Sequence, residues 1–575
     1  MIKYFFYQKN PASHYIYVDM HINEVKADFL QLQLPTWRPG RYELGNFAKN
    51  IKCVEAFNEK NEPLYYTKLT KDLWKINVEK ASSIKVTYSY YASELNAGAC
   101  FADSNQLYVN PIHCCMYVVD RTNEIHQIEL QIPDTYKIAT SLIQNNKCLT
   151  AANYDELVDS PFMASNNIKT FFYEVNDIKF YMHFNGECQP NIEQFRKDFY
   201  AFTKKQIDFW GDFPYNEYHF LFQVLSFKFY HGVEHKKSTV IAIGPGYSIN
   251  EGLTYEDVLG VSCHELFHTW NIKTIRPKEM MPYNYTKENY ASTGYVYEGF
   301  TTYYGDKLLF SSDVFTFQQY IETLQDRLLK HFHNFGRYNL SVAASSWETW
   351  LDGYLPGAPY RKTNIYDEGS LIAFILDVSI LKATKNKKSL RDVCLLLYHR
   401  FGKNQIGYTE KDIFNLVNEV SGIDLSQFLK KYAYSPSDFE EPLLEAFKYL
   451  GFDLIKQLNP IFSEQYFGFK TIENGLYSKI SIVAPYSPAW KAGLFNGDEI
   501  LSVNGIALKN NLNNWLQYFI NFESISLVVN SNEQTKIIQL QKDKKDNTFF
   551  GLLVLRKNNS FGLQAHKNFE VWKNC

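Results

Sequence analysis

Two histidines separated by three residues, His264 and His268, enclose Glu265 in the pentapeptide His-Glu-Leu-Phe-His. On an α-helix, residues four apart lie on one face, so both imidazoles can converge on one metal ion. Glu265, one residue after the first histidine, can then reach a water held by that ion rather than the ion itself. These residue types in this spacing predict a zinc site of the kind that hydrolyses peptides.

A catalytic zinc needs a third protein ligand and one position open to water. We expect Glu298 to be that ligand, because it is the one acid of the apolar and aromatic segment 295–304, where an unpaired carboxylate is costly to bury. Two alternatives stay open: Glu298 is an ordinary exposed acid, or Asp306 takes its place. We expect no metal ligation from four histidines that lack a partner at suitable spacing, namely His231, His235, His331 and His333.

The surroundings of the pentapeptide favour a helix. Apolar residues recur at Val258, Leu259, Val261 and Leu266, and neither proline nor glycine interrupts the chain between Val261 and Asn271. An amphipathic helix is predicted over 192–210 and a strand over 218–224, and helical patterns then dominate to about residue 455. Strands followed by helices predict an α+β catalytic domain over 186–455.

The two flanking regions have a different pattern. Residues 1–185 alternate short β-type runs with turns, which predicts a β-sandwich that serves as a scaffold or flanks the substrate. Strands and turns return in 456–575, where an Asn-Gly hairpin signal stands at Asn504 and Gly505. We therefore expect three domains.

Composition excludes several classes of protein. The chain has 575 residues, of which 45% are apolar and 21% charged, so it can build ordinary cores. A net charge of −3 without a basic run argues against nucleic acid as a partner. No stretch approaches the roughly 18 apolar residues of a membrane span, and the N-terminus lacks the apolar core of a secretory signal, so a cytoplasmic location is expected. Nine cysteines without a Cys-x-x-Cys pair argue against a disulfide framework or a thiolate zinc site.

A resemblance extends over most of the chain. His264–Pro277 together with Glu298–Tyr304 resembles the glycyl aminopeptidase family of zinc metallopeptidases, which are gluzincins with a thermolysin-like catalytic domain. Pro35–Tyr42 is similar to part of that family's N-terminal β domain, and Ser487–Gly505 resembles a PDZ domain, which the family usually carries at its C-terminus. The resemblance implies a multidomain α+β fold. Its parts are an N-terminal β-sandwich over 1–185, a thermolysin-like, largely helical peptidase domain over 186–455, and a PDZ domain with a C-terminal tail over 456–575.

The resemblance also implies two substrate contacts. Tyr230–His235 is similar to the family's Gly-Gly-Leu-Glu-His segment, so Glu234 is expected to pair with the substrate's α-ammonium beside the backbone of Gly232. A solvated acid on an edge strand is the alternative reading of Glu234. Tyr366 lies in a stretch similar to the family's Tyr-x-Lys-Gly, with Glu368 in place of lysine, and its hydroxyl is expected to stabilise the oxyanion. Trp270 and Arg276 match the family motif and are expected to pack and to fix a loop.

The resemblance thus predicts a zinc aminopeptidase that removes small N-terminal residues, glycine and alanine first, from peptides with a free N-terminus. One Zn²⁺ per chain is expected at His264, His268 and Glu298, with Glu265 as the general base. Two alternatives remain: a zinc endopeptidase, and a non-catalytic protein that binds peptides through its PDZ domain. In that domain, Phe467, Gly468 and Phe469 would form the loop that receives a peptide C-terminus, or the domain packs on the catalytic domain.

Overall fold

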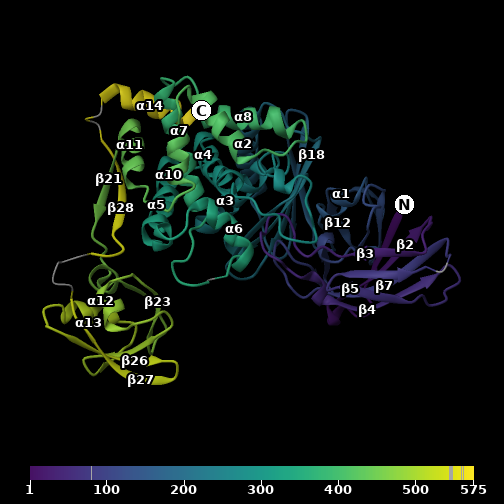
Figure 1. The fold of residues 1–575 in the computed structure, drawn as a ribbon, viewed down its shortest axis with the longest axis horizontal. Helices are drawn as coiled ribbons and strands as arrows, with labels where there is room; N and C mark the ends of the chain where they lie inside the picture. Colours follow the sequence, from purple (N-terminus) through teal and green to yellow (C-terminus); the bar gives the residue numbers. More distant parts are fainter. Residues whose placement is uncertain (79, 356, 543–547, 559, 561) are drawn as a thin grey trace.

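The computed structural model describes residues 1–575 apart from 79, 356, 543–547, 559 and 561. A β-rich N-terminal part, a largely helical central part and a smaller β-rich C-terminal part follow one another (Figure 1). The predicted fold class, with its β-sandwich, helical peptidase domain and PDZ domain, is confirmed. Among the described residues, no helix is both long enough and apolar enough to cross a membrane.

Alternating side chains build the N-terminal part. In β1 (Ile2–Tyr7), the side chains of Ile2, Tyr4 and Phe6 are buried while those between them are half-buried, as expected of a strand with one face on a core. The main sheet has the order β13-β14-β11-β1-β2-β7-β4. Its other strands are β2 (Tyr15–Asn23), β4 (Ile51–Asn58), β7 (Ser83–Tyr91), β11 (His126–Gln131), β13 (Ile143–Asn145) and β14 (Cys148–Ala151).

Two smaller sheets complete this part, in the orders β10-β3-β6-β5 and β12-β15-β9-β8. Their strands are β3 (Phe29–Gln33), β5 (Tyr66–Thr70), β6 (Leu73–Asn77), β8 (Phe101–Ala102), β9 (Gln106–Val109), β10 (Tyr117–Val118), β12 (Lys137–Thr140) and β15 (Phe162–Ser165). A short helix, α1 (Tyr154–Val158), precedes β15. Side chains from all three sheets share one hydrophobic core, separate from the larger core of the central part.

The central part begins with a five-stranded sheet in the order β16-β17-β18-β20-β19. Its strands are β16 (Lys169–Val175), β17 (Ile178–Asn185), β18 (Glu217–Val224), β19 (Phe229–Glu234) and β20 (Ser238–Gly244). Helix α2 (Ile192–Trp210) has the predicted range and connects the parallel strands β17 and β18. Strand β19 pairs antiparallel with β20 and forms one edge, so its outer backbone groups are available to an extended ligand.

The hydrogen bonding differs from the predicted domain division in two places. Strands β16 and β17 precede residue 186 but belong to the sheet of the central part, because β17 pairs with β18. Strand β21 (Phe452–Gln457) crosses the predicted division at 455/456 and pairs with β28 (Leu552–Lys557). A period-two pattern does not reveal which sheet a strand joins, so sequence alone could not place these strands.

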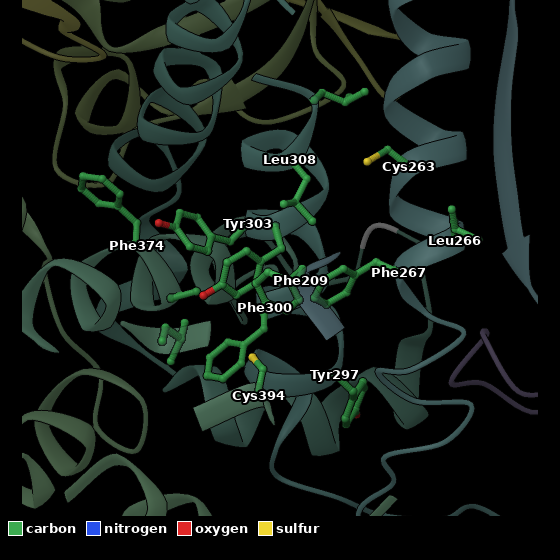
Figure 2. Packing of buried hydrophobic residues seen from close by; sticks show 14 of the residues in the cluster. Phe209, Cys263, Leu266, Phe267, Tyr297, Phe300, Tyr303, Leu308, Phe374 and Cys394 are labelled. Carbon is green, nitrogen blue, oxygen red and sulfur yellow. The ribbon is translucent and has the colours of Figure 1, made fainter. Parts of the chain in front are cut away.

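Helices pack around and beyond the sheet. They are α3 (Gly252–Phe267), α4 (Thr301–Ser311), α5 (Phe317–His333), α6 (Val342–Asp352), α7 (Asp367–Ala383), α8 (Leu390–Leu397), α9 (Glu410–Ser421), α10 (Ser426–Tyr432) and α11 (Glu440–Leu450). Figure 2 shows the aromatic core that joins several of them. The ring centre of Phe209 in α2 lies 5.6 Å from that of Phe267 in α3 and 4.6 Å from that of Tyr304 in α4. This core holds α3 rigidly against the sheet, which fixes the direction of the side chains on its opposite face.

The C-terminal part is a six-stranded PDZ-like sheet that follows the order β22-β23-β24-β26-β27, with β25 paired to β24. Its elements are β22 (Phe469–Glu473), β23 (Ser478–Val483), α12 (Pro488–Ala492), β24 (Glu499–Val503), β25 (Ile506–Ala507), α13 (Leu512–Tyr518), β26 (Ile525–Ser531) and β27 (Gln534–Leu540). The chain then returns through β28 to α14 (Gly562–Asn574), which lies beside α11 (Figure 1). Trp572 of α14 is 1% exposed and joins the core of the central part.

Candidate metal centre

Helix α3 carries two of the predicted ligands at its C-terminal end. His264 lies in its last turn and His268 caps it, and their Nε2 atoms are 3.0 Å apart. His268 Nδ1 lies 2.8 Å from the backbone oxygen of Asn271. Because a backbone oxygen only accepts, Nδ1 carries a proton, and in the neutral ring Nε2 then has the lone pair that a metal would take.

Glu298 completes a triangle of ligand atoms with these imidazoles. Its Oε2 lies 3.4 Å from Nε2 of His268 and 3.8 Å from Nε2 of His264. A tetrahedral zinc ion with bonds of about 2.1 Å places its ligand atoms about 3.4 Å apart. Glu298 is 2% exposed, and Oε2 has no hydrogen-bond partner among the described residues. A buried carboxylate oxygen left in this position fits a cation, so the three side chains fit zinc.

A π-helical turn presents Glu298. Residues Tyr295–Phe300 form this turn directly before α4, and such turns are frequent at functional sites. The Asn271 side-chain amide donates to the backbone oxygen of Val296 at 2.9 Å and to the hydroxyl of Thr301 at 3.0 Å. Asn271 therefore orients His268 through its backbone oxygen and holds the turn that carries Glu298 through its side chain.

Glu265 points into the same space from α3. It is 6% exposed, and its Oε2 has no hydrogen-bond partner among the described residues. Burial raises the pKa of its carboxyl well above the ordinary value. A Cβ atom on Gly232 of β19 would lie 2.3 Å from Glu265 Oε1, so the edge strand approaches the carboxylate as closely as only glycine allows.

Glu234 ends strand β19 beside these groups. It is 4% exposed, and its Oε1 has no hydrogen-bond partner in the described chain. One oxygen of Glu234, one of Glu265 and a ring nitrogen of His268 all lie within 4.8 Å of one another. The alternative of a solvated edge-strand acid does not fit this burial.

Tyr366 stands immediately before α7, with its ring centre 6.4 Å from that of His264. Its hydroxyl lies 3.1 Å from that of Tyr354. Burial raises the pKa of Tyr366 well above the ordinary value, and the charge of Glu298 adds to the rise, so the hydroxyl keeps its proton at neutral pH. A Cβ atom on Gly299 would lie 2.4 Å from Gly369 Cα, so two glycines let α7 approach the π-helical turn.

The competing acids and histidines have other partners. Asp306 accepts a hydrogen bond from Arg327 Nε at 2.7 Å and belongs to neither group of potential ligands found in the described residues. His331 is buried between the Phe439 backbone N–H, which donates to Nε2, and Glu368, whose Oε2 lies 2.6 Å from Nδ1. Glu368, which stands where the resembling family has lysine, is therefore held by His331 and belongs to neither ligand group of the described residues.

The three remaining histidines also lie outside the ligand groups. Burial lowers the pKa of His231 to about 3, which keeps its ring neutral. His235 pairs with Asp159 at 3.3 Å, and His333 lies 2.9 Å from the amine of Lys470.

Trp270 and Arg276 have packing and loop-fixing contacts. Trp270 stacks on Trp210 with ring centres 5.7 Å apart. Arg276 donates from Nε to the Ile272 backbone oxygen at 3.2 Å, which closes the loop that follows α3.

No sequence pattern predicts a role for Tyr42 or Gly40, although both lie in Pro35–Tyr42, the segment similar to the family's N-terminal domain. The Tyr42 hydroxyl donates to Glu298 Oε1 at 2.7 Å. A Cβ atom on Gly40 would lie 2.3 Å from Glu234 Oε2, so this N-terminal segment closes one side of the site. No periodicity connects residues this far apart, and the family-like segment was the one available signal.

The PDZ loop that was predicted to receive a peptide C-terminus is buried, and its glycine N–H is already hydrogen-bonded within the domain. Phe467 and Phe469 are 1% and 0% exposed and belong to the PDZ core. Gly468 has φ +70°, and its N–H donates to the Ser463 backbone oxygen inside the domain. A Cβ atom on Gly468 would lie 3.1 Å from the ring of Phe549.

Comparisons with known proteins show which family the chain resembles. Three family models match the chain: "Peptidase M61 N-terminal domain" over residues 3–166, "M61 glycyl aminopeptidase" over 257–372, and "PDZ domain" over 479–530. An aminopeptidase N family protein from Idiomarina loihiensis has a similar structure, with a TM-score of 0.91, 26% identity and 100% of each chain covered. An M1 zinc metallopeptidase from Deinococcus radiodurans aligns with a TM-score of 0.46 and 12% identity over 76% of this chain and 94% of its own. No curated protein matches the sequence.

Proposed function

Because this chain belongs to the M61 glycyl aminopeptidase family of zinc metallopeptidases and is itself a zinc aminopeptidase, we propose that it releases small residues, glycine and alanine first, from the N-terminus of peptides. The name of the matching family, glycyl aminopeptidase, supports the proposed preference for an N-terminal glycine. The single observation that carries the exopeptidase proposal is the buried carboxylate of Glu234, whose Oε1 has no hydrogen-bond partner among the described residues beside the catalytic groups.

One zinc ion is proposed to bind His264, His268 and Glu298. The triangle of 3.0, 3.4 and 3.8 Å between their ligand atoms supports this assignment. When bound, zinc acts as a Lewis acid that polarises the scissile carbonyl and acidifies water. The chain's own residues then have to move protons, hold the substrate and stabilise the developing charge.

Glu265 is the proposed general base. Its carboxylate accepts a proton from the attacking water and delivers it to the nitrogen of the leaving amine, so one group serves as base and then as acid. Burial strengthens this role, because a carboxylate removed from water is a better proton acceptor. The close approach of Gly232 keeps one side of Glu265 free of side-chain atoms.

Tyr366 is the proposed donor to the oxyanion. Its hydroxyl is protonated at neutral pH and lies on the His264 side of the site, where it can donate a hydrogen bond as negative charge develops on the carbonyl oxygen. The neighbouring hydroxyl of Tyr354, 3.1 Å away, orients it.

Glu234 is the proposed partner of the substrate's α-ammonium. A charged hydrogen bond at the end of an edge strand sets the register of an extended peptide, so that its first peptide bond lies at the metal. The backbone of Gly40 against Glu234 leaves little room for chain beyond the amine. Together these features favour removal of one residue per cut over internal cleavage.

We propose that the PDZ domain packs on the catalytic domain instead of capturing a peptide C-terminus. The Gly468 N–H, which a bound carboxylate would need, already donates to Ser463. The Tyr360 hydroxyl donates to the Val483 backbone oxygen at 2.5 Å across the contact between the two domains. Binding of a C-terminal peptide to the full chain, measured by fluorescence anisotropy, would contradict this proposal.

The test of the proposed function compares glycyl-arylamide with N-acetyl-glycyl-arylamide. The zinc-loaded enzyme should hydrolyse the first and leave the second intact. Cleavage of both would indicate an endopeptidase, and cleavage of neither, with zinc bound, a non-catalytic binding protein. Glu298→Ala should lower the zinc content measured by elemental analysis, whereas Asp306→Ala should retain it.

A further inference from the structure

Tyr42 contacts the proposed metal ligand Glu298 from a distant part of the chain. The Tyr42 hydroxyl donates to Glu298 Oε1 at 2.7 Å, and the two residues are 1% and 2% exposed. The other oxygen, Oε2, faces the imidazoles of His264 and His268. Each oxygen of this carboxylate therefore has a separate environment.

The ring of Tyr42 is held in place by other aromatic side chains. It lies 5.1 Å from Tyr297 and 6.0 Å from Trp350, measured between ring centres. Trp350 in turn packs 4.9 Å from Trp37, whose indole N–H donates to the Asn284 backbone oxygen at 2.7 Å. Close packing in a buried aromatic cluster leaves the Tyr42 hydroxyl little freedom to move.

A fixed donor matters because a carboxylate rotates readily about its terminal bond. Hydrogen bonds to the non-ligating atoms of metal ligands restrict such rotation, and their loss typically costs 10- to 100-fold in metal affinity. We propose that Tyr42 is a positioning residue of the metal centre, which holds Oε1 of Glu298 so that Oε2 is directed at the zinc.

Residues from two parts of the molecule thus build the metal centre together. Tyr42 follows the N-terminal β3, whereas Glu298 is 256 residues further along the chain. The Thr36 backbone N–H donates to the Tyr285 backbone oxygen at 2.8 Å, which holds the Tyr42 segment against the helical part. Zinc affinity should therefore depend on a contact that the helical part alone does not contain.

The experiment measures zinc affinity of the full chain and rests on the proposed ligand set. Zn²⁺ is titrated in competition with a chromophoric chelator for the wild type, Tyr42→Phe and Tyr297→Phe. Tyr297 is the matched control, since its ring touches that of Tyr42 but its buried hydroxyl has no hydrogen-bond partner among the described residues. Tyr42→Phe should weaken zinc binding about 10- to 100-fold, and Tyr297→Phe should leave it unchanged.

Equal zinc affinity of Tyr42→Phe and wild type would overturn the inference, and so would equal losses in both variants, because aromatic packing rather than the hydroxyl would then be responsible. A second readout is the visible absorption of the Co²⁺-loaded protein, which should change in Tyr42→Phe but not in Tyr297→Phe. Glu298→Ala separates this inference from the proposed function: if that variant binds zinc like the wild type, the ligand set itself is wrong.

Discussion

Two of the clusters of buried charged residues in the central part differ in how their polar atoms are paired. Around Asp377, Oδ2 accepts from Lys307 at 2.8 Å and from the Tyr303 hydroxyl at 2.5 Å, while Oδ1 accepts from the Leu390 backbone N–H at 2.8 Å. Trp572 donates to the Tyr303 hydroxyl and so completes the network. In contrast, Glu234, Glu265 and Glu298 each keep a buried oxygen without a hydrogen-bond partner in the described chain.

This difference separates a structural cluster from a functional one. A buried charge that is fully paired contributes to one stable arrangement, whereas an unpaired one is costly unless a ligand, metal or substrate completes it. Substitutions in the first cluster should therefore change stability without changing chemistry. Substitutions in the second should do the reverse, and four variants test that contrast.

Glu265→Gln should have the largest effect. Loss of the general base should reduce turnover of glycyl-arylamide about 10²- to 10⁴-fold, while zinc content stays the same. The midpoint of thermal unfolding should be unchanged or higher, because an amide carries no buried charge. Asp257→Asn on the same helix is the control and should retain activity. Retained turnover in Glu265→Gln would refute the assignment.

Asp377→Asn should act on stability alone. Lys307 and Asp377 are both 0% exposed, and removing one charge of such a pair costs about 3–5 kcal/mol of unfolding free energy. Denaturant unfolding followed by tryptophan fluorescence measures the loss. The control is Asp208→Asn, which breaks an exposed pair with Lys204 and should cost less than about 1 kcal/mol. If Asp377→Asn lost zinc affinity without losing stability, the two clusters would not differ in role.

Tyr366→Phe should lower kcat about 10²- to 10³-fold with little change in KM, as expected for a donor that acts in the transition state. Tyr354→Phe removes the neighbouring hydroxyl and should have a smaller effect, since that group only orients the donor. Steady-state kinetics on glycyl-arylamide measure both. If Tyr354→Phe proves the more damaging, the donor role belongs to Tyr354 instead.

Glu234→Gln should have the smallest of the four effects. Hydrogen bonds to charged groups contribute about 1.5–3 kcal/mol, so KM for a free-amine substrate should rise about 10- to 100-fold. The wild type leaves the acetylated substrate intact, so the measurement is KM for glycyl-arylamide, with Asp257→Asn as the control. An unchanged KM in Glu234→Gln would show that Glu234 does not recognise the amine.

Much of the fold followed from local patterns. The β-type runs predicted within 1–185 and the amphipathic helix predicted over 192–210 form as expected, because one face of each element is buried. The sheet that β16 and β17 join could not be predicted, because the alternation of side chains along a strand does not reveal its hydrogen-bond partners.

The same limit applies to the metal centre, where a contact between two domains could not be predicted. His264 and His268 are four residues apart on one helix, so their convergence is a local property. Glu298 was suggested by the cost of burying an acid among aromatic residues, and the structure places it 3.4 Å from His268. Zinc binding by these residues stays a prediction. Tyr42 was out of reach, because its contact with Glu298 depends on how two domains dock.

The return of the chain to the helical part after the PDZ domain bears on how the protein is made. A ribosome releases the chain from its N-terminus, and regions synthesised first fold first. Trp572, whose indole packs in the helical core and hydrogen-bonds Tyr303, is synthesised only after the whole PDZ domain. The core of the central part is therefore completed only after the PDZ domain has been synthesised, so a nascent chain carries its proposed zinc ligands outside the ribosome before that hydrophobic core is closed.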